Sequence, residues 1–68
     1  MIGTLKFFNS LRGFGFIRGD DGRDAFVHAS AVKHIDPHDL VEGARLKYDT
    51  VSEARGLRAV DLQKFAQA

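Results

Sequence analysis

The residues most suited to specific chemistry are aromatic side chains in two short segments. Arg12-Gly13-Phe14-Gly15-Phe16-Ile17 carries two phenyl rings two positions apart. Phe26 and His28 repeat that spacing further along the chain, where they alternate with Ala25 and Val27. Side chains two apart on a β-strand lie on the same face. Rings that share an exposed face can stack nucleic-acid bases, while neighbouring cations attract the phosphates.

The glycines decide which face of the first segment is exposed. Phenylalanine usually belongs in a core, but inward-pointing rings at Phe14 and Phe16 would leave only two glycines and Ile17 on the outer face. Glycine in a strand interior costs roughly 0.5–1 kcal/mol relative to alanine, and it suits a sharp bend such as a barrel corner. We therefore expect Ile17 inside and both rings outside, and by the same alternation Val27 inside with Phe26 and His28 outside.

Short strands separated by turns must position these side chains. We expect strands over residues 2–9, 12–18, 24–28, 44–51 and 57–63, and a frayed tail over 64–68. Phe7 or Phe8 can join the exposed rings only if a bulge or a strand end breaks the alternation of the first strand. In the later strands Tyr48, Val60 and Leu62 are predicted to point inward. Turns are expected at 20–22, where Asp-Gly indicates a hairpin, and at 52–56, with a helical turn over 30–33 capped by Ser30.

Composition restricts the classes of function. The chain has 68 residues, enough for one domain over 1–68, and its net charge is only +1, with ten basic and nine acidic residues. A typical duplex-DNA binder is strongly basic, so nucleic-acid binding here needs segregated charges or a second force such as stacking. The absence of cysteine excludes disulfides and thiolate metal sites. No signal peptide and no apolar run of about 20 residues are found, so a cytoplasmic protein without membrane association is expected.

Both aromatic segments resemble motifs of the bacterial cold-shock proteins. Residues 12–17 match the start of the RNP1 pattern, and Ala25-Phe26-Val27-His28 resembles RNP2 of cold-shock domains. The order is the reverse of that in an RRM, and the two helices of an RRM are missing. The opening Gly3-Thr4-Leu5-Lys6-Phe7-Phe8-Asn9 is similar as well, and the resemblance covers about residues 2–63. It implies an all-β, five-stranded antiparallel OB-fold barrel that binds single-stranded RNA and DNA, acts as an RNA chaperone and regulates transcription and translation.

The resemblance also implies which residues bind the ligand. The contacts carried over are Lys6, Phe7, Phe14, Phe16, Phe26 and His28, with Asn9, Arg12 and Arg55 at the edge and Arg58 adding phosphate attraction. The family usually has tryptophan in place of Phe7, and often has aromatic residues in place of Ala29 and near Pro37. Because a stacking surface is smaller without these rings, we predict weaker binding or a shorter footprint than is typical.

Two other classes of function remain open. A protein-interaction module would bury the phenylalanine patch against a partner or a second copy; it would not need Lys6 and Arg12, whereas nucleic-acid binding must weaken with salt. An enzyme acting on nucleic acid lacks support, because no nucleophile–base pair or metal cluster is evident. His34, Asp36, His38 and Asp39 lie in one loop, and Asp20, Asp21 and Asp24 suit turn chemistry. We therefore expect no catalytic residue, metal, cofactor or small-molecule substrate, while monomer and domain-swapped dimer both stay possible.

Overall fold

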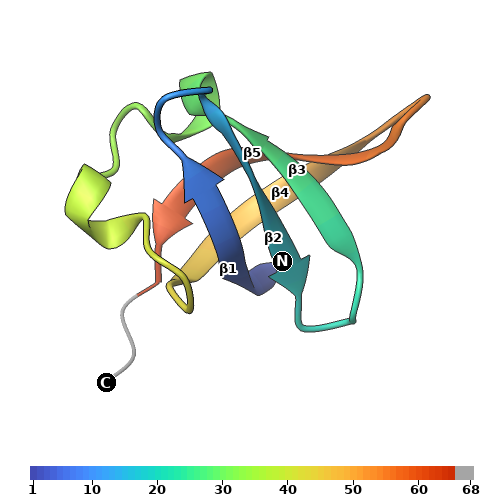
Figure 1. The fold of residues 1–68 in the computed structure, drawn as a ribbon. Helices are drawn as coiled ribbons and strands as arrows, with labels where there is room; N and C mark the ends of the chain where they lie inside the picture. The colour runs from blue at the N-terminus through green and yellow to red at the C-terminus, as the bar shows by residue number, and fades with distance from the viewer. Residues whose placement is uncertain (66–68) are drawn as a thin grey trace.

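The computed structural model describes residues 1–65 and forms a closed five-stranded barrel (Figure 1). The strands follow one another around the barrel in the order β1-β2-β3-β5-β4. Two 3-10 helices join β3 to β4. In chain order the elements are β1 (Ile2–Asn9), β2 (Phe14–Gly19), β3 (Asp24–His28), η1 (Ala29–Val32), η2 (Pro37–Asp39), β4 (Arg45–Glu53) and β5 (Gly56–Lys64).

The barrel closes through one parallel pairing. Four neighbouring pairs are antiparallel, and β3 pairs with β5 in parallel through Ala25–Leu57 and Phe26–Arg58. Strand direction cannot alternate all the way around a ring of five, so at least one pair must be parallel. The predicted five-stranded OB-type barrel is thus confirmed, with β3–β5 as its single parallel seam.

The core contains the inward side chains that the alternation predicted for the middle of the chain. Ile17 and Val27 are fully buried, and Tyr48 is 2% exposed. These assignments are confirmed. The outward direction predicted for the alternating side chains is confirmed as well, since Phe16 and His28 are exposed and Phe14 and Phe26 are half-buried. The buried apolar set is Leu5, Ile17, Ala25, Val27, Val32, Ile35, Leu46, Tyr48, Ala59 and Leu62.

The predicted boundaries are wrong at the start of β2 and at the hairpin between β4 and β5. β2 begins at Phe14 rather than Arg12, because Arg12 and Gly13 belong to the turn, where Gly13 has a φ of +76°. The hairpin after β4 is also tighter than expected: its ladder continues through Glu53–Gly56, which leaves only residues 54–55 as the turn instead of 52–56. Backbone pairing extends β4 and β5 toward their turn through polar residues, where no alternation with apolar residues marks a strand.

The inward assignment of Val60 is wrong because β5 contains a bulge. Lys47 pairs with Gln63 and Asp49 with Val60, so β5 has one extra residue at this point. Asp61 within the bulge has a φ of +55°. An extra residue reverses the alternation of a strand, so Leu62 is fully buried while Val60 is only half-buried.

The end of the chain is more ordered than expected up to Phe65. Lys64 pairs with Leu46 and forms an ion pair of 3.3 Å with Asp39, and the Phe65 N–H donates to the Arg45 carbonyl at 3.1 Å. Fraying is therefore wrong for residues 64 and 65, and the rest of the predicted tail, 66–68, lies outside the described residues.

The helical turn after β3 is present, but its cap differs from the prediction. η1 covers Ala29–Val32, and His28 rather than Ser30 is the N-cap, since its side chain accepts from the Ser30 N–H. Within residues 1–65, no helix has the length and apolar character needed to cross a membrane, and no three or more His, Asp or Glu side chains group as a metal site would require.

Candidate nucleic-acid interface

A bulge in β1 turns Phe7 outward. Leu5 pairs with Ile17 but Phe7 pairs with Phe16, so Lys6 is an extra residue in the ladder. As a result Phe7 is 45% exposed, while Phe8 packs against the core. The predicted break in the alternation is confirmed at this point, and Phe7 is the residue that joins the exposed rings.

Regular alternation in β2 and β3 places three further rings beside Phe7. Phe16 lies opposite Phe26, and Phe14 lies opposite His28. Ring centroids are 5.6 Å apart for Phe7–Phe16, 5.7 Å for Phe16–Phe26, 5.9 Å for Phe14–Phe26 and 6.1 Å for Phe7–Phe14. Each ring thus contacts two others in the range where aromatic pairs attract. We call this four-membered cluster of Phe7, Phe14, Phe16 and Phe26 the aromatic platform.

Gly15 lets β1 approach β2 closely behind the platform. A Cβ atom at Gly15 would lie 2.8 Å from the Phe8 Cα, a separation that a real side chain cannot adopt. The sequence interpretation attributed both glycines of this segment to a sharp bend. The structure gives each a local reason instead, since Gly13 supplies the positive φ of the turn and Gly15 makes room for the neighbouring backbone.

His28 extends the platform with a fixed ring. Its Nδ1 lies 2.8 Å from Ser30 Oγ and accepts from the Ser30 N–H at 3.1 Å. Because Nδ1 accepts this backbone bond, the proton of the neutral imidazole belongs on Nε2. The exposed His28 side chain therefore presents a donor as well as a ring face beside the platform.

A hollow of about 450 Å³ separates the platform from the β4–β5 hairpin. Phe16, Phe26 and His28 form one side, and the hairpin contributes the other. The hairpin extends beyond the barrel toward the side of β3 (Figure 1). The residues it brings to the hollow are Glu53, Arg55, Gly56, Leu57 and Arg58. Sequence reasoning predicts the two arginines as ligand contacts but misses Glu53 and Leu57. These two residues face the hollow because the β4–β5 ladder continues to the Glu53–Gly56 pair, which the sequence did not indicate.

Positive charge without an acidic partner gathers around this surface. Among residues 1–65, five cations form no ion pair, and three of them adjoin this surface: Lys6, Arg12 and Arg55. The other two are Lys33, which follows η1, and Lys47 on β4. Lys6 precedes Phe7 in the bulge, Arg12 lies in the turn before Phe14, and Arg55 lines the hollow. Arg58 differs, since its Nε is 3.6 Å from Glu53 Oε2.

Arg18 and Asp24 neutralise one another at the far end of β2. Arg18 Nε donates to Asp24 Oδ1 at 2.9 Å, and both side chains are about half exposed. This hydrogen bond outweighs the opposing effect of desolvation and, with smaller contributions from the charges of Arg18 and Lys6, lowers the pKa of Asp24. Arg18 is thus less available to a phosphate than the three unpaired cations beside the platform.

Asn9 forms a turn rather than a free ligand contact. Its Oδ1 accepts the N–H groups of Leu11 at 3.0 Å and Arg12 at 3.1 Å. The side-chain oxygen is therefore committed to the backbone that follows β1.

Comparison with known proteins now assigns the family. A family model described as "'Cold-shock' DNA-binding domain" matches residues 1–65. This chain belongs to the cold-shock domain family. Membership supports nucleic-acid binding in general, which agrees with the platform and its cations. The predicted resemblance is thereby confirmed.

Curated relatives of this cold-shock domain match over most of their length. The cold shock protein CspA of Rhizobium meliloti is 54% identical over 54 residues, which is 78% of each chain. The cold shock-like protein CspC of Bacillus cereus is 44% identical over 96% of this chain and 100% of its own. The cold shock protein CspC of Bacillus subtilis is 44% identical over 91% of this chain and 94% of its own.

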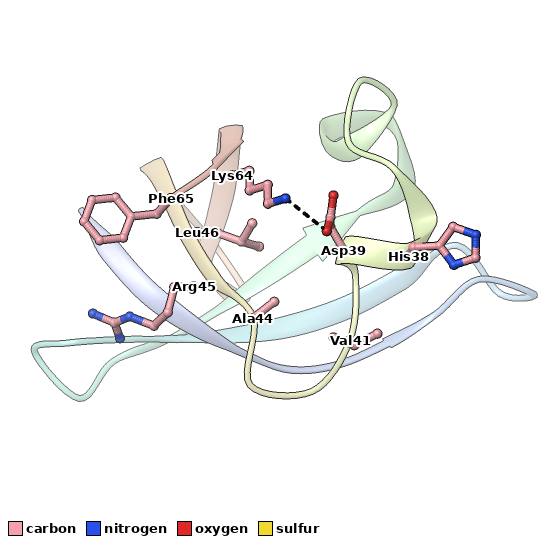
Figure 2. A pocket seen from close by; sticks show the side chains of 8 residues that line it. All are labelled: His38, Asp39, Val41, Ala44, Arg45, Leu46, Lys64 and Phe65. Carbon is pink, nitrogen blue, oxygen red and sulfur yellow. Dashed lines mark ion pairs between the residues drawn. The ribbon is translucent and has the colours of Figure 1, made fainter. Parts of the chain in front are cut away.

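A second hollow, of about 320 Å³, lies away from the platform of this cold-shock domain. Figure 2 shows Lys64 paired with Asp39 across it, and Arg45 at its edge. Arg45 donates to Thr4 Oγ1 at 2.9 Å and to both carboxylate oxygens of Asp20 at 2.8 and 2.9 Å, which lowers the pKa of Asp20. These cations are occupied by the fold, and no residue predicted to bind nucleic acid lines this hollow.

Proposed function

We propose that this cold-shock domain binds single-stranded RNA and DNA by stacking bases on the aromatic platform. The observation that carries the proposal is the group of four phenyl rings on one outer face, each in contact with two others and flanked by unpaired cations. Stacking contributes about 1–3 kcal/mol per base and accepts any base. It supplies the second force that a net charge of +1 requires.

The rings and cations predicted to bind have distinct roles in this proposal, while Asn9 shapes the turn that carries Arg12. Bases stack on the four platform rings, and His28 adds a further face with its Nε2 donor. Phosphates are attracted to Lys6, Arg12 and Arg55, while a phosphate that reaches Arg58 competes with the carboxylate of Glu53. Duplex is excluded because its bases already stack on one another and cannot reach the rings.

We further propose that the protein acts in the cytoplasm as an RNA chaperone and as a regulator of transcription and translation. A chaperone must release its target, and this surface is built for moderate affinity. The family often has an aromatic residue at the position of Ala29, which begins η1, and another near Pro37, which begins η2. The smaller stacking area supports weaker binding or a shorter footprint than is typical of the family.

Fluorescence anisotropy of a labelled U-rich or T-rich single strand tests the proposal. The label belongs on the oligonucleotide because the chain has no tryptophan. We expect binding that weakens with salt and that unlabelled duplex of equal length does not compete away. Absence of binding at low salt would refute the proposal and favour a protein partner for the phenylalanine patch, whereas equal competition by duplex would refute the stacking mechanism.

A further inference from the structure

The turn between β1 and β2 presents an apolar side chain that the proposed platform does not use. Leu11 is 97% exposed, whereas the other exposed large apolar side chains of the described residues are 37–54% exposed. A single exposed leucine is common on protein surfaces. Its significance therefore depends on how rigidly it is held and on what lies beside it.

Hydrogen bonds hold this turn in one conformation. Asn9 Oδ1 accepts the N–H groups of Leu11 and Arg12, and the Asn9 carbonyl accepts the Gly13 N–H at 2.8 Å. The Gly13 carbonyl in turn accepts the Ala29 N–H at 2.8 Å, which attaches the turn to η1 (Figure 1). Because the backbone is already ordered, a ligand that covers Leu11 incurs little extra ordering cost.

The turn stands at one end of the aromatic platform. Asn9–Phe14 is the last pair of the β1–β2 ladder, and Leu11 lies in the turn directly beyond it. Arg12, the next residue, forms no ion pair within residues 1–65. A strand that is stacked on the rings and continues past Phe14 would therefore meet an aliphatic tip with a cation at its side.

We propose that Leu11 is a wedge that enters the base stack at the first base pair of a duplex flanking the bound single strand. The proposal rests on the proposed single-strand binding. Leucine is among the apolar side chains that proteins insert between base steps, where they partly unstack the duplex. Arg12 holds the phosphate beside the wedge, and the aliphatic side chain imposes no base preference. Leu11 thus converts single-strand binding into opening of the adjacent helix.

Tailed RNA hairpins separate the wedge from the platform. The ligands are a U-rich single strand alone and the same strand attached as a 5′ or a 3′ tail to a hairpin, with a fluorophore and a quencher at the base of the stem. We expect Leu11→Ser to bind the single strand within about twofold of wild type. On a tailed hairpin it should lose about five- to tenfold in affinity, as partial burial of one leucine predicts, and lose stem opening in parallel. The 5′ and 3′ tails place the stem at opposite ends of the bound strand. If the strand crosses the platform in one direction, only one of the two hairpins brings its stem to the turn, so the loss of affinity and of stem opening should occur with that hairpin alone.

Two variants serve as controls. Leu11→Met keeps an apolar side chain and should open the stem as wild type does. Val41→Ser removes another exposed aliphatic side chain, 54% exposed and outside the platform, and should change nothing. Wild-type opening by Leu11→Ser, or an equal loss on the single strand and on both hairpins, would overturn the wedge while leaving single-strand binding intact. Failure of the wild type to bind the single strand would instead refute the proposed function itself.

Discussion

Replacing Phe16 by alanine separates the binding role of the platform from its contribution to stability. The Phe16 ring is 37% exposed, so one of its faces can receive a base. Loss of one stacked base removes about 1–3 kcal/mol of binding free energy. That corresponds to a Kd raised about 5- to 150-fold.

The same substitution should leave the barrel folded. Phe16 contacts Phe7 at 5.6 Å and Phe26 at 5.7 Å, and each aromatic pair contributes about 0.5–1.5 kcal/mol. These pair contributions add to the apolar area that the ring buries. Because Phe16 is 37% exposed, the expected total loss of stability stays below the roughly 3–5 kcal/mol of a fully buried phenylalanine. A chain of this length is stable by about 3–10 kcal/mol, so Phe16→Ala should retain its far-ultraviolet circular dichroism at low temperature.

The matched control is the next residue in the chain, on the opposite face of β2. Ile17 is fully buried, so Ile17→Val should lower the free energy of unfolding by about 0.5–1.5 kcal/mol without changing affinity. Anisotropy titrations with a labelled single strand and urea unfolding would be run on both variants. Affinity within twofold of wild type for Phe16→Ala would refute stacking on this ring. Equal losses of affinity in the two variants would show that binding follows stability rather than contact with the ring.

Two further predictions follow from the charges of the barrel. With Lys6, Arg12 and Arg55 as phosphate contacts, the logarithm of the affinity should fall with the logarithm of salt concentration with a slope of about −2. Arg55→Gln should make that slope less steep by about 0.7, whereas Lys47→Gln, on the exposed face of β4, should leave it unchanged. Equal slopes for Arg55→Gln and wild type would contradict a contact between Arg55 and a phosphate. Burial, reinforced by the nearby aspartates, raises the pKa of Tyr48. Its contribution to stability is therefore complete below the pKa of the unfolded chain, about 10, and is lost as pH rises through the higher pKa of the folded barrel. The test is urea unfolding followed by circular dichroism from pH 8 to 11. Above pH 10, the free energy of unfolding of wild type should fall relative to that of Tyr48→Phe. If the two free energies change with pH in parallel, Tyr48 ionises as freely in the barrel as in the unfolded chain.

The face assignments could be made from sequence because they rest on side-chain chemistry. Ile17 and Val27 are branched apolar residues that alternate with rings and glycines, so only one orientation buries the aliphatic side chains. The ends of β1 and β3 also match their predicted limits, 2–9 and 24–28. In these segments the residue types and the period of two point to the same answer.

The missed features depend on backbone geometry that leaves little trace in residue type. The bulge at Asp61 reverses the inward positions of β5 without a glycine or proline to mark it. The β4–β5 ladder runs through Ser52 and Glu53, whose polar side chains resemble those of a turn. Tertiary pairing therefore decided both cases. Tertiary pairing also determines which residues form the site. Arg55 and Leu57 lie at the hollow beside the platform because β5 pairs in parallel with β3.

The arrangement of charge explains how a nearly neutral barrel can favour one face for an anionic ligand. Five cations are paired with carboxylates, and exposed pairs of this kind contribute only about 0–1 kcal/mol each to stability. Their larger effect is on the electrostatic potential, because each pair cancels a positive charge that would otherwise attract phosphates. Two of the cancelled charges, Arg45 and Lys64, lie at the second hollow away from the platform. The pairs are Arg18–Asp24, Arg23–Asp21, Arg45–Asp20, Arg58–Glu53 and Lys64–Asp39. Of the five cations without an ion pair among residues 1–65, three lie beside the rings, and the other two are Lys33 and Lys47. At the hollow a phosphate must still compete with Glu53 for Arg58. In the proposed binding mode, charge therefore directs the strand to the platform, and most of the affinity has to come from stacking.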